Sequence, residues 1–396
     1  MNVMASLDRE VLSRLAARRL ARVHSIADFR DAARRVMPRM VFNYVDGGSG
    51  SESTLRENEA AFERIRLVSA APANVAARSQ EITLFGRKLP TPLIVAPLGL
   101  ASSFWTKGEL TLARAAAKHG IPFVLSNNAS VTLDEAMAAG SGPKWFQLYT
   151  PPSRDATKEW ARRVKEAGYE AIEVTVDTLV PSRRLRDMRA GFTMPFAWTP
   201  RKFLDVALHP EWAARIGPHG APRPSLMFAL PWGVDGAADM RTRLTPALDW
   251  DLLRWFRDEW KGTLIVKGLA DPRAAKIALD SGMDAVVISN HGGRQLDGAI
   301  ATIDILPEFV AEVGGKMPIL IDSGFRSGTD VVKALALGAT AVQLGRAMAY
   351  AVATAGEAGA VRALDIVRGE LDTAMALCGV ARIADLTPAL IRRVAR

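Results

Sequence analysis

Cysteine and long apolar runs are the scarcest features of this sequence. Cys378 is the single cysteine among 396 residues, so an intrachain disulfide cannot form. No stretch of about 18 consecutive apolar residues occurs, which argues against a transmembrane helix. The first residues are rich in arginine and lack the apolar segment of a secretory signal. We therefore expect residues 1–23 to be an N-terminal surface extension and the protein to be cytoplasmic.

The overall composition is typical of a globular protein with a large core. Hydrophobic residues make up 49% of the chain and charged residues 23%, which disfavours intrinsic disorder. Lys and Arg number 51 against 42 Asp and Glu, so the formal net charge is +9. Such an excess suits nucleic acid, an anionic membrane surface or an acidic substrate. The sequence has no nucleic-acid-binding motif and no continuous basic stripe, so we expect no nucleic-acid partner.

Short β-rich runs alternate with segments of helical period from about residue 90 onward. Eight such runs cover 92–97, 123–126, 144–149, 171–177, 263–268, 285–290, 318–324 and 341–345. Helical candidates between them, each ending near a glycine, are 109–119, 155–167, 272–281 and 328–338. This alternation predicts the α/β class and a single (β/α)₈ TIM barrel with an N-terminal helical cap.

One interval after the fourth run interrupts the alternation. Residues 190–250 hold eight of the 22 prolines and four of the nine tryptophans, so this segment cannot be one regular helix. Its mixture of aromatic and basic residues, such as Trp198, Arg201 and Phe203, suits a membrane interface, a partner surface or a lid over the barrel. Plain packing of the insertion, about 190–248, against the barrel is an equally weighted alternative.

Polar residues gather at the C-terminal ends of the predicted strands, where the chemistry of barrel enzymes takes place. The most informative motif is SNHGGRQLD at 289–297, in which His291 and Arg294 share a glycine-rich loop and can flank a small anion. Of the five histidines, only His291 ends a predicted barrel strand. Asp177 at the end of the fourth run is the natural partner to orient its imidazole. Arg184 is available to assist substrate binding.

Two further motifs predict a phosphate site. The stretch IDSGFRSG at 321–328 follows the seventh strand, and LGR at 344–346 ends the eighth. Glycine-rich loops after these two strands commonly bind phosphate in this fold, through backbone N–H groups beside cationic side chains. Because a tight turn alone would not need both Arg326 and Arg346, the two arginines indicate a phosphorylated ligand.

The ordered set of motifs resembles the FMN-dependent L-2-hydroxy acid dehydrogenase and oxidase family. The set consists of QLY, TVDT with a following RR, VKG, SNHGGRQLD, DSGFRSG and LGR. The resemblance covers about residues 24–385, which leaves 386–396 as a C-terminal tail. It implies bound FMN and oxidation of an L-2-hydroxy acid to the 2-oxo acid. It also implies a homotetramer and no metal.

The resemblance assigns roles to individual residues. His291 would be the base, with Asp177 behind it, and Lys267 would stabilise the anion of the reduced flavin near N1 and O2. The side chains that would hold the substrate are Tyr44, Tyr149, Arg184, His291 and Arg294. The residues that would contact FMN are Pro97, Leu98, Gly99, Ser126, Gln147, Thr175, Lys267, Ser289, Asp322, Ser323, Gly324, Phe325, Arg326, Gly345 and Arg346.

Within the family, several segments are similar in sequence and spacing to those of the mandelate dehydrogenase branch. Gly99 is the most telling position, because oxidases of this family often have Ala there. We therefore expect a mandelate- or lactate-like substrate and electron transfer to a quinone or another carrier, with an oxygen-using oxidase that produces hydrogen peroxide as the alternative. The insertion and the positive charge suggest peripheral attachment to the inner membrane. Whether the α-hydrogen leaves as a proton or as hydride stays open.

Overall fold

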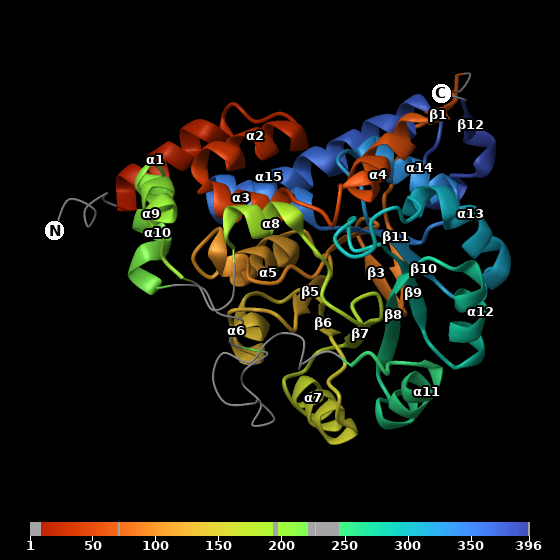
Figure 1. Cartoon of the computed structure of the whole chain (residues 1–396). Coiled ribbons are helices and arrows are strands. Elements are labelled where there is room, and N and C mark those ends of the chain that lie inside the picture. The colour runs from red at the N-terminus through yellow and green to blue at the C-terminus, as the bar shows by residue number, and fades with distance from the viewer. Residues whose placement is uncertain (1–8, 70–71, 193–196, 221–225, 227–244, 395–396) are drawn as a thin grey trace.

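Eight parallel strands form a closed barrel at the centre of the computed structural model, which describes residues 9–69, 72–192, 197–220, 226 and 245–394 (Figure 1). The strands, in chain order, are β4 (Leu93–Val95), β5 (Phe123–Ser126), β6 (Lys144–Leu148), β7 (Ala171–Thr175), β8 (Thr263–Leu269), β9 (Ala285–Ile288), β10 (Ile319–Ile321) and β11 (Ala341–Leu344). Neighbouring strands follow the chain order, and β11 closes the barrel against β4. Every expected run contains one strand, so the predicted TIM barrel is confirmed.

Helices surround the barrel in the alternating order that the sequence predicts. The four helical candidates appear as α5 (Gly108–Lys118), α7 (Arg154–Glu166), α12 (Pro272–Asp280) and α14 (Gly328–Ala336). The other helices of the barrel layer are α6 (Leu133–Ala138), α11 (Trp250–Glu259), α13 (Thr302–Val313) and α15 (Arg346–Leu377), which is kinked at Gly356. Side-chain caps fix several starts, such as Ser327 on Asp330 N–H of α14.

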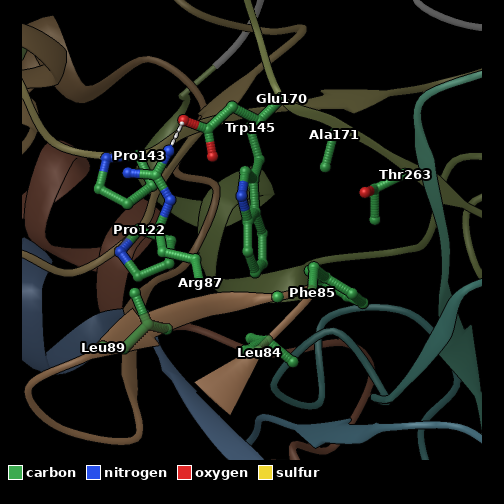
Figure 2. A pocket seen from close by; sticks show the side chains of 11 residues that line it. Leu84, Phe85, Arg87, Leu89, Pro122, Pro143, Trp145, Glu170, Ala171 and Thr263 are labelled. Atoms are coloured by element: carbon green, nitrogen blue, oxygen red, sulfur yellow. Dashed lines mark hydrogen bonds and ion pairs between the residues drawn. The ribbon is translucent and has the colours of Figure 1, made fainter. Parts of the chain in front are cut away.

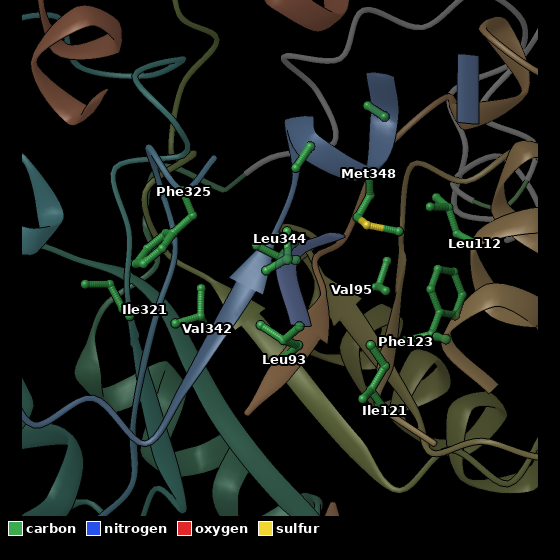
Figure 3. Close-up of a cluster of buried hydrophobic side chains, with 14 of the residues drawn as sticks. Leu93, Val95, Leu112, Ile121, Phe123, Ile321, Phe325, Val342, Leu344 and Met348 are labelled. Atoms are coloured by element: carbon green, nitrogen blue, oxygen red, sulfur yellow. The ribbon is translucent and has the colours of Figure 1, made fainter. Parts of the chain in front are cut away.

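The two faces of the barrel strands have different partners. Outward residues such as Leu93 and Val95 pack against the helices, including Leu112 of α5 and Met348 of α15 (Figure 3). Inward residues from all eight strands form a separate apolar cluster, Ile94, Val124, Trp145, Ala171, Ile265, Ala285, Val287, Leu320 and Ala341. Since side chains alternate along a strand, a residue two positions beyond a cluster member also faces the interior.

A hairpin covers the N-terminal end of the barrel. It consists of β2 (Ile82–Leu84) and β3 (Arg87–Leu89), and its Leu84 and Leu89 join the interior cluster. A hollow of about 450 Å³ lies beside it, lined by Phe85 and Trp145 and bordered by the Arg87 and Glu170 ion pair at 2.6 Å (Figure 2). This hollow is at the end opposite to the predicted active site.

The N-terminal residues form a helical cap, as predicted. The cap consists of α2 (Ile26–Val36), α3 (Arg39–Asp46) and α4 (Ser53–Glu63), and α1 (Arg9–Leu20) lies in the expected N-terminal extension. Helices α1 and α2 pack on α15, and Arg19 of α1 contacts Glu211 at 2.6 Å. Farther along, β1 (Ile65–Leu67) pairs antiparallel with β12 (Ile391–Arg393), which ties the expected C-terminal tail to the cap.

The insertion is described only in part, because 193–196, 221–225 and 227–244 lie outside the described residues. Its described helices are α8 (Leu185–Ala190), α9 (Pro200–Ala207) and α10 (Pro210–Ile216). Trp212 of α10 is buried, and its Nε1 donates to Ser103 O at 2.8 Å, so this part of the insertion packs on the barrel. None of the described helices is both long enough and apolar enough to cross a membrane.

Candidate active site

An imidazole and a carboxylate meet at the C-terminal end of the barrel. His291 follows β9 and Asp177 follows β7, and His291 Nδ1 lies 3.1 Å from Asp177 Oδ1. The side chains are 21% and 11% exposed, so the imidazole still reaches the barrel mouth. Burial opposes the ionised form of Asp177, but the charge and hydrogen bond of His291, together with Lys267, lower its pKa below the ordinary value. The structure thus brings together the pair that the sequence predicted.

Two arginines lie beside this pair. Arg294 Nη1 donates to the carbonyl oxygens of Tyr44 at 2.6 Å and Gly47 at 2.9 Å, and the guanidinium lies 5.0 Å from the centre of the Tyr44 ring. Arg184 Nε donates to Arg294 O at 3.3 Å. Burial, and secondly the charge of Arg294, lower the pKa of Arg184 to about 10. Two cations held so close together favour the binding of an anion between them.

Two tyrosines complete the mouth of the barrel. Tyr44 Oη donates to Gly99 O at 3.2 Å, which places the Pro97, Leu98 and Gly99 turn after β4 next to helix α3. Tyr149 follows β6, and burial raises its pKa above the ordinary value, with smaller effects of Asp177 and Arg184. The predicted substrate-binding side chains therefore share one region.

Lys267 occupies the barrel interior at the rim. Its Nζ forms an ion pair with Asp322 Oδ2 and donates to Ser289 Oγ at 3.1 Å. Burial opposes its charge, but Asp322 and Glu173 more than offset this effect and raise the pKa of Lys267. The ammonium group is therefore a fixed positive charge in the barrel mouth.

Buried polar atoms without partners lie near this charge. Ser126 Oγ donates to Gln147 Oε1 at 3.0 Å, but Gln147 Nε2 and Thr175 Oγ1 have no hydrogen-bond partner among the described residues. Native proteins leave few buried polar groups unpaired, so these atoms indicate a ligand with both donors and acceptors. The polar edge of the FMN ring offers such groups, and the residues present fit this cofactor.

The loops after β10 and β11 have the glycines and arginines expected of a phosphate site. Gly324 has φ +89°, and a Cβ atom there would lie 2.1 Å from Asn58 O, so only glycine fits. Ser323 Oγ accepts from Gly292 N–H at 3.0 Å, and Phe325 packs on Phe62 with ring centres 4.9 Å apart.

The two arginines of this site also contact the protein itself. Arg346, directly after Gly345 at the start of α15, donates to the carbonyl oxygens of Val45, Gly47 and Gly292 at 2.8 to 3.1 Å. Burial lowers its pKa to about 10. Arg326 Nη2 pairs with Glu59 of α4 at 2.7 Å. Each guanidinium has five N–H donors, so both retain donors for a ligand.

Several supporting residues escape sequence reasoning. Thr178 Oγ1 donates to Asp177 Oδ1 at 3.0 Å, and Gln295 Nε2 donates to Asp177 O at 3.1 Å. Asp46, 4% exposed, accepts from Arg30, Arg186 and Tyr350 and so fixes helix α3, which carries Tyr44. Burial opposes its ionisation, but these hydrogen bonds lower the pKa of Asp46 to about 2. No local pattern marks Gln295 or Asp46, because most of their partners are far away in the sequence.

Within the described ranges, no group of three or more His, Cys, Asp or Glu side chains could hold a metal ion.

Known proteins resemble this chain over almost its whole length. A family model for FMN-dependent dehydrogenases matches residues 33–393. An L-lactate dehydrogenase of Pectobacterium atrosepticum is 41% identical over 370 residues, which cover 92% of this chain and 96% of that protein. An L-lactate dehydrogenase of Caulobacter vibrioides is also 41% identical, over 374 residues that cover 93% of this chain and 97% of that protein.

Solved structures agree with this result. The crystal structure of the monotopic membrane protein (S)-mandelate dehydrogenase matches with a TM-score of 0.88 and 35% identity, covering 94% of this chain and all of that one. A mandelate oxidase structure matches with a TM-score of 0.79 and 35% identity, covering 94% of this chain and 99% of that one. This chain therefore belongs to the FMN-dependent dehydrogenase family and is an oxidoreductase that uses FMN to oxidise a 2-hydroxy acid.

Proposed function

We propose that the protein oxidises an L-2-hydroxy acid of lactate or mandelate type and passes the electrons to a quinone or another carrier. The observation that carries this proposal is the meeting of the His291 and Asp177 pair with Arg184 and Arg294 in one barrel mouth. A 2-hydroxy acid presents a carboxylate, a hydroxyl group and an α-hydrogen close together. These three features match two cations and one base.

In this proposal, His291 accepts a proton from the substrate at Nε2, because its Nδ1 faces Asp177. Asp177 holds the ring orientation and stabilises the imidazolium that forms. Arg294 and Tyr44 bind the substrate carboxylate with help from Arg184, and Tyr149 donates a hydrogen bond to the substrate oxygen. This arrangement holds the α-carbon in a fixed position relative to the base.

FMN, when bound, supplies the two-electron acceptor that no side chain can provide. Lys267 would lie beside the pyrimidine edge of the ring, where its charge stabilises the negative charge of the reduced state. The ring's polar edge would meet Ser126, Gln147 and Thr175, and the turn at 97–99 would offer backbone groups to it. The ribityl chain and phosphate would contact 322–326, Gly345 and Arg346, with Ser289 supporting Lys267.

Anaerobic flavin reduction tests this function directly. The holoenzyme is mixed with glycolate and with the separate enantiomers of lactate, mandelate and longer 2-hydroxy acids, and loss of the yellow colour is followed. We expect fast bleaching by an L-acid and little by its D-enantiomer. Bleaching by none of the L-acids would contradict the proposed reaction. The ranking of the acids identifies the substrate, because the pocket walls select side-chain size.

The electron acceptor is tested by reoxidation of the reduced enzyme. We expect a soluble quinone to reoxidise the flavin much faster than dissolved oxygen does, because Gly99 stands at the position where related oxidases often have Ala. Faster reoxidation by oxygen, with release of hydrogen peroxide, would favour the oxidase alternative.

The insertion supplies a surface suited to a membrane. Phe203 and Leu204 of α9 and Leu208 at its C-terminal cap are 63%, 60% and 69% exposed, and Trp198 (62% exposed) lies against Phe203. Aromatic and aliphatic side chains beside cations are typical of helices that lie in a membrane interface. We propose that this face, together with the positive net charge, attaches the protein peripherally to an anionic inner membrane on its cytoplasmic side.

Sedimentation with anionic liposomes tests the attachment. The variant F203S/L204S/L208S is expected to remain in the supernatant while the wild type sediments, because the variant loses the apolar area that enters the interface. Leu377→Ser, which changes an equally exposed leucine of α15, is the matched control and should sediment like the wild type. Equal sedimentation of the triple variant and the wild type would contradict the proposal.

The extents of the parts and the assembly also remain proposals. We propose an extension at 1–23, a flavin domain at 24–385 with its insertion at about 190–248, and a tail at 386–396. We further propose a homotetramer, which light scattering of the purified protein would test.

A further inference from the structure

A buried carboxyl group lies inside the barrel, below the proposed flavin site. Glu173 on β7 has no exposed surface. It lies two residues after Ala171, which belongs to the interior cluster, and two residues before Thr175 at the rim. All three side chains therefore face the barrel interior. The proposed reaction uses Thr175 but does not use Glu173.

Glu173 is paired with an amide from the opposite wall of the barrel. Gln343 Nε2 on β11 donates to Glu173 Oε2 at 2.6 Å, and β11 is four strands away from β7 in the closed barrel of eight. Glu173 Oε1 and Gln343 Oε1 are also buried, and neither has a hydrogen-bond partner in the described part of the chain. Leaving two buried acceptor oxygens without a donor lowers the stability of the folded protein.

A single proton on Glu173 resolves this problem. A protonated carboxyl has one O–H donor and one acceptor, and a primary amide has N–H donors and one acceptor. A neutral acid and an amide can therefore satisfy each other with two hydrogen bonds, whereas a carboxylate and an amide can share only the N–H bond. The two unpartnered oxygens thus favour the neutral form of Glu173.

Charged side chains from three directions act on Glu173. Burial is the largest influence and raises the pKa of Glu173 to about 7, although Lys267 of β8 and the Gln343 hydrogen bond oppose this rise. Asp322 after β10 and Asp177 after β7 add smaller effects in the same direction as burial. The remaining strands contribute uncharged inward residues, namely Ile94, Val124, Trp145, Gln147 and Val287.

We propose that Glu173 is a positioning residue that controls how much of the Lys267 charge acts on the flavin. This inference rests on the proposed function, which places Lys267 beside the flavin ring. When Glu173 is neutral, Asp322 is the main counter-charge of Lys267. When Glu173 releases its proton to solvent, a second carboxylate offsets the ammonium charge, so negative charge on the reduced ring is stabilised less. The flavin reduction potential therefore falls more steeply with pH while Glu173 titrates.

Infrared difference spectroscopy of the oxidised holoenzyme tests the state of Glu173. The spectrum of E173Q is subtracted from that of the wild type between pH 5.5 and pH 8.5. We expect the carbonyl band of a protonated carboxyl at pH 5.5 and its loss as the pH rises. Absence of the band at pH 5.5 would overturn the inference.

Reduction potentials measured against reference dyes test the coupling. We expect wild type and E173Q to have equal potentials at pH 5.5 and E173Q to have the higher potential at pH 8.5. Parallel potentials across this range would overturn the coupling even if the infrared band is present. Lys267→Met distinguishes a failure of the Glu173 inference from a failure of the proposed function. An unchanged reduction potential in this variant would mean that Lys267 does not lie beside the flavin, which would contradict the proposed site. Glu170→Gln, a carboxyl change on the barrel exterior, is the control and should match the wild type throughout.

Discussion

Replacing Glu173 by glutamine should stabilise the protein in a pH-dependent manner. The carboxyl is fully buried, and its pKa is about 7 in the folded protein against an ordinary value of 4.5. The folded protein therefore binds this proton more tightly than the unfolded chain does. The contribution of Glu173 to the free energy of unfolding is therefore largest below pH 4.5. This contribution falls as the pH rises from 4.5 to 7 and stays low above pH 7.

The size of the effect follows from the difference between the two pKa values. At 1.36 kcal/mol per pKa unit, the ionised carboxyl costs the folded state about 3 kcal/mol at pH 8. Glutamine has nearly the same shape and can pair with Gln343 through two amide hydrogen bonds. E173Q should therefore match the wild type near pH 4.5 and be more stable by about 3 kcal/mol at pH 8.

Urea unfolding of both proteins at several pH values, with saturating FMN, measures this difference through the transition midpoints and a shared slope. The control is E170Q, because Glu170 is 42% exposed and forms a surface ion pair with Arg87. Its change should stay below about 1 kcal/mol at every pH between 6 and 8. Curves for E173Q and the wild type that run parallel from pH 5 to pH 8 would refute the reasoning, since Glu173 would then titrate as it does in the unfolded chain.

Three substitutions at the barrel mouth test the remaining assignments. His291→Gln should retain FMN but lower the rate of anaerobic bleaching by a factor on the order of 10² to 10⁴, because it removes only the base; retained fast bleaching would contradict that role. Lys267→Met should slow bleaching in stopped-flow measurements, because the negative charge on the reduced flavin loses at most several kcal/mol of stabilisation. Unchanged kinetics would mean that Lys267 does not face the flavin. Gly99→Ala should raise the rate at which oxygen reoxidises the reduced enzyme, relative to the rate with a quinone. The new methyl group must displace Asn128, whose Cβ would lie 2.9 Å away. An unchanged ratio of the two rates would mean that Gly99 does not determine the electron acceptor.

Sequence periodicity was sufficient to predict the barrel. A buried parallel strand needs a short apolar run with β-branched residues, and a covering helix needs an amphipathic segment, so both leave local patterns. Each of the eight runs contains a strand, and the four helical candidates agree with the observed bounds within one or two residues. The N-terminal cap was also expected, but its docking on α15 was not, because the two segments are more than 300 residues apart.

The active site likewise has residues that the sequence predicts and contacts that it does not. His291, Asp177, Arg294 and Lys267 stand at strand ends in a fold whose chemistry is confined to that end, so their positions in the sequence sufficed to select them. The hydrogen bond of Gln295 with Asp177 connects loops from different strands. Such contacts depend on side-chain directions that no local pattern records.

The sequence by itself determined the alternation of strands and helices, the polar rim and the family, because each of these is encoded by residue type and spacing along the chain. Only the tertiary structure decided which charges meet. Glu173 and Gln343 sit in mainly apolar strands and gave no signal as separate residues. Closure of the barrel brings them to within 2.6 Å of each other, 170 positions apart in sequence, beneath the charge of Lys267. Burial at that point, and not the residue type, makes the carboxyl group sensitive to pH near neutrality.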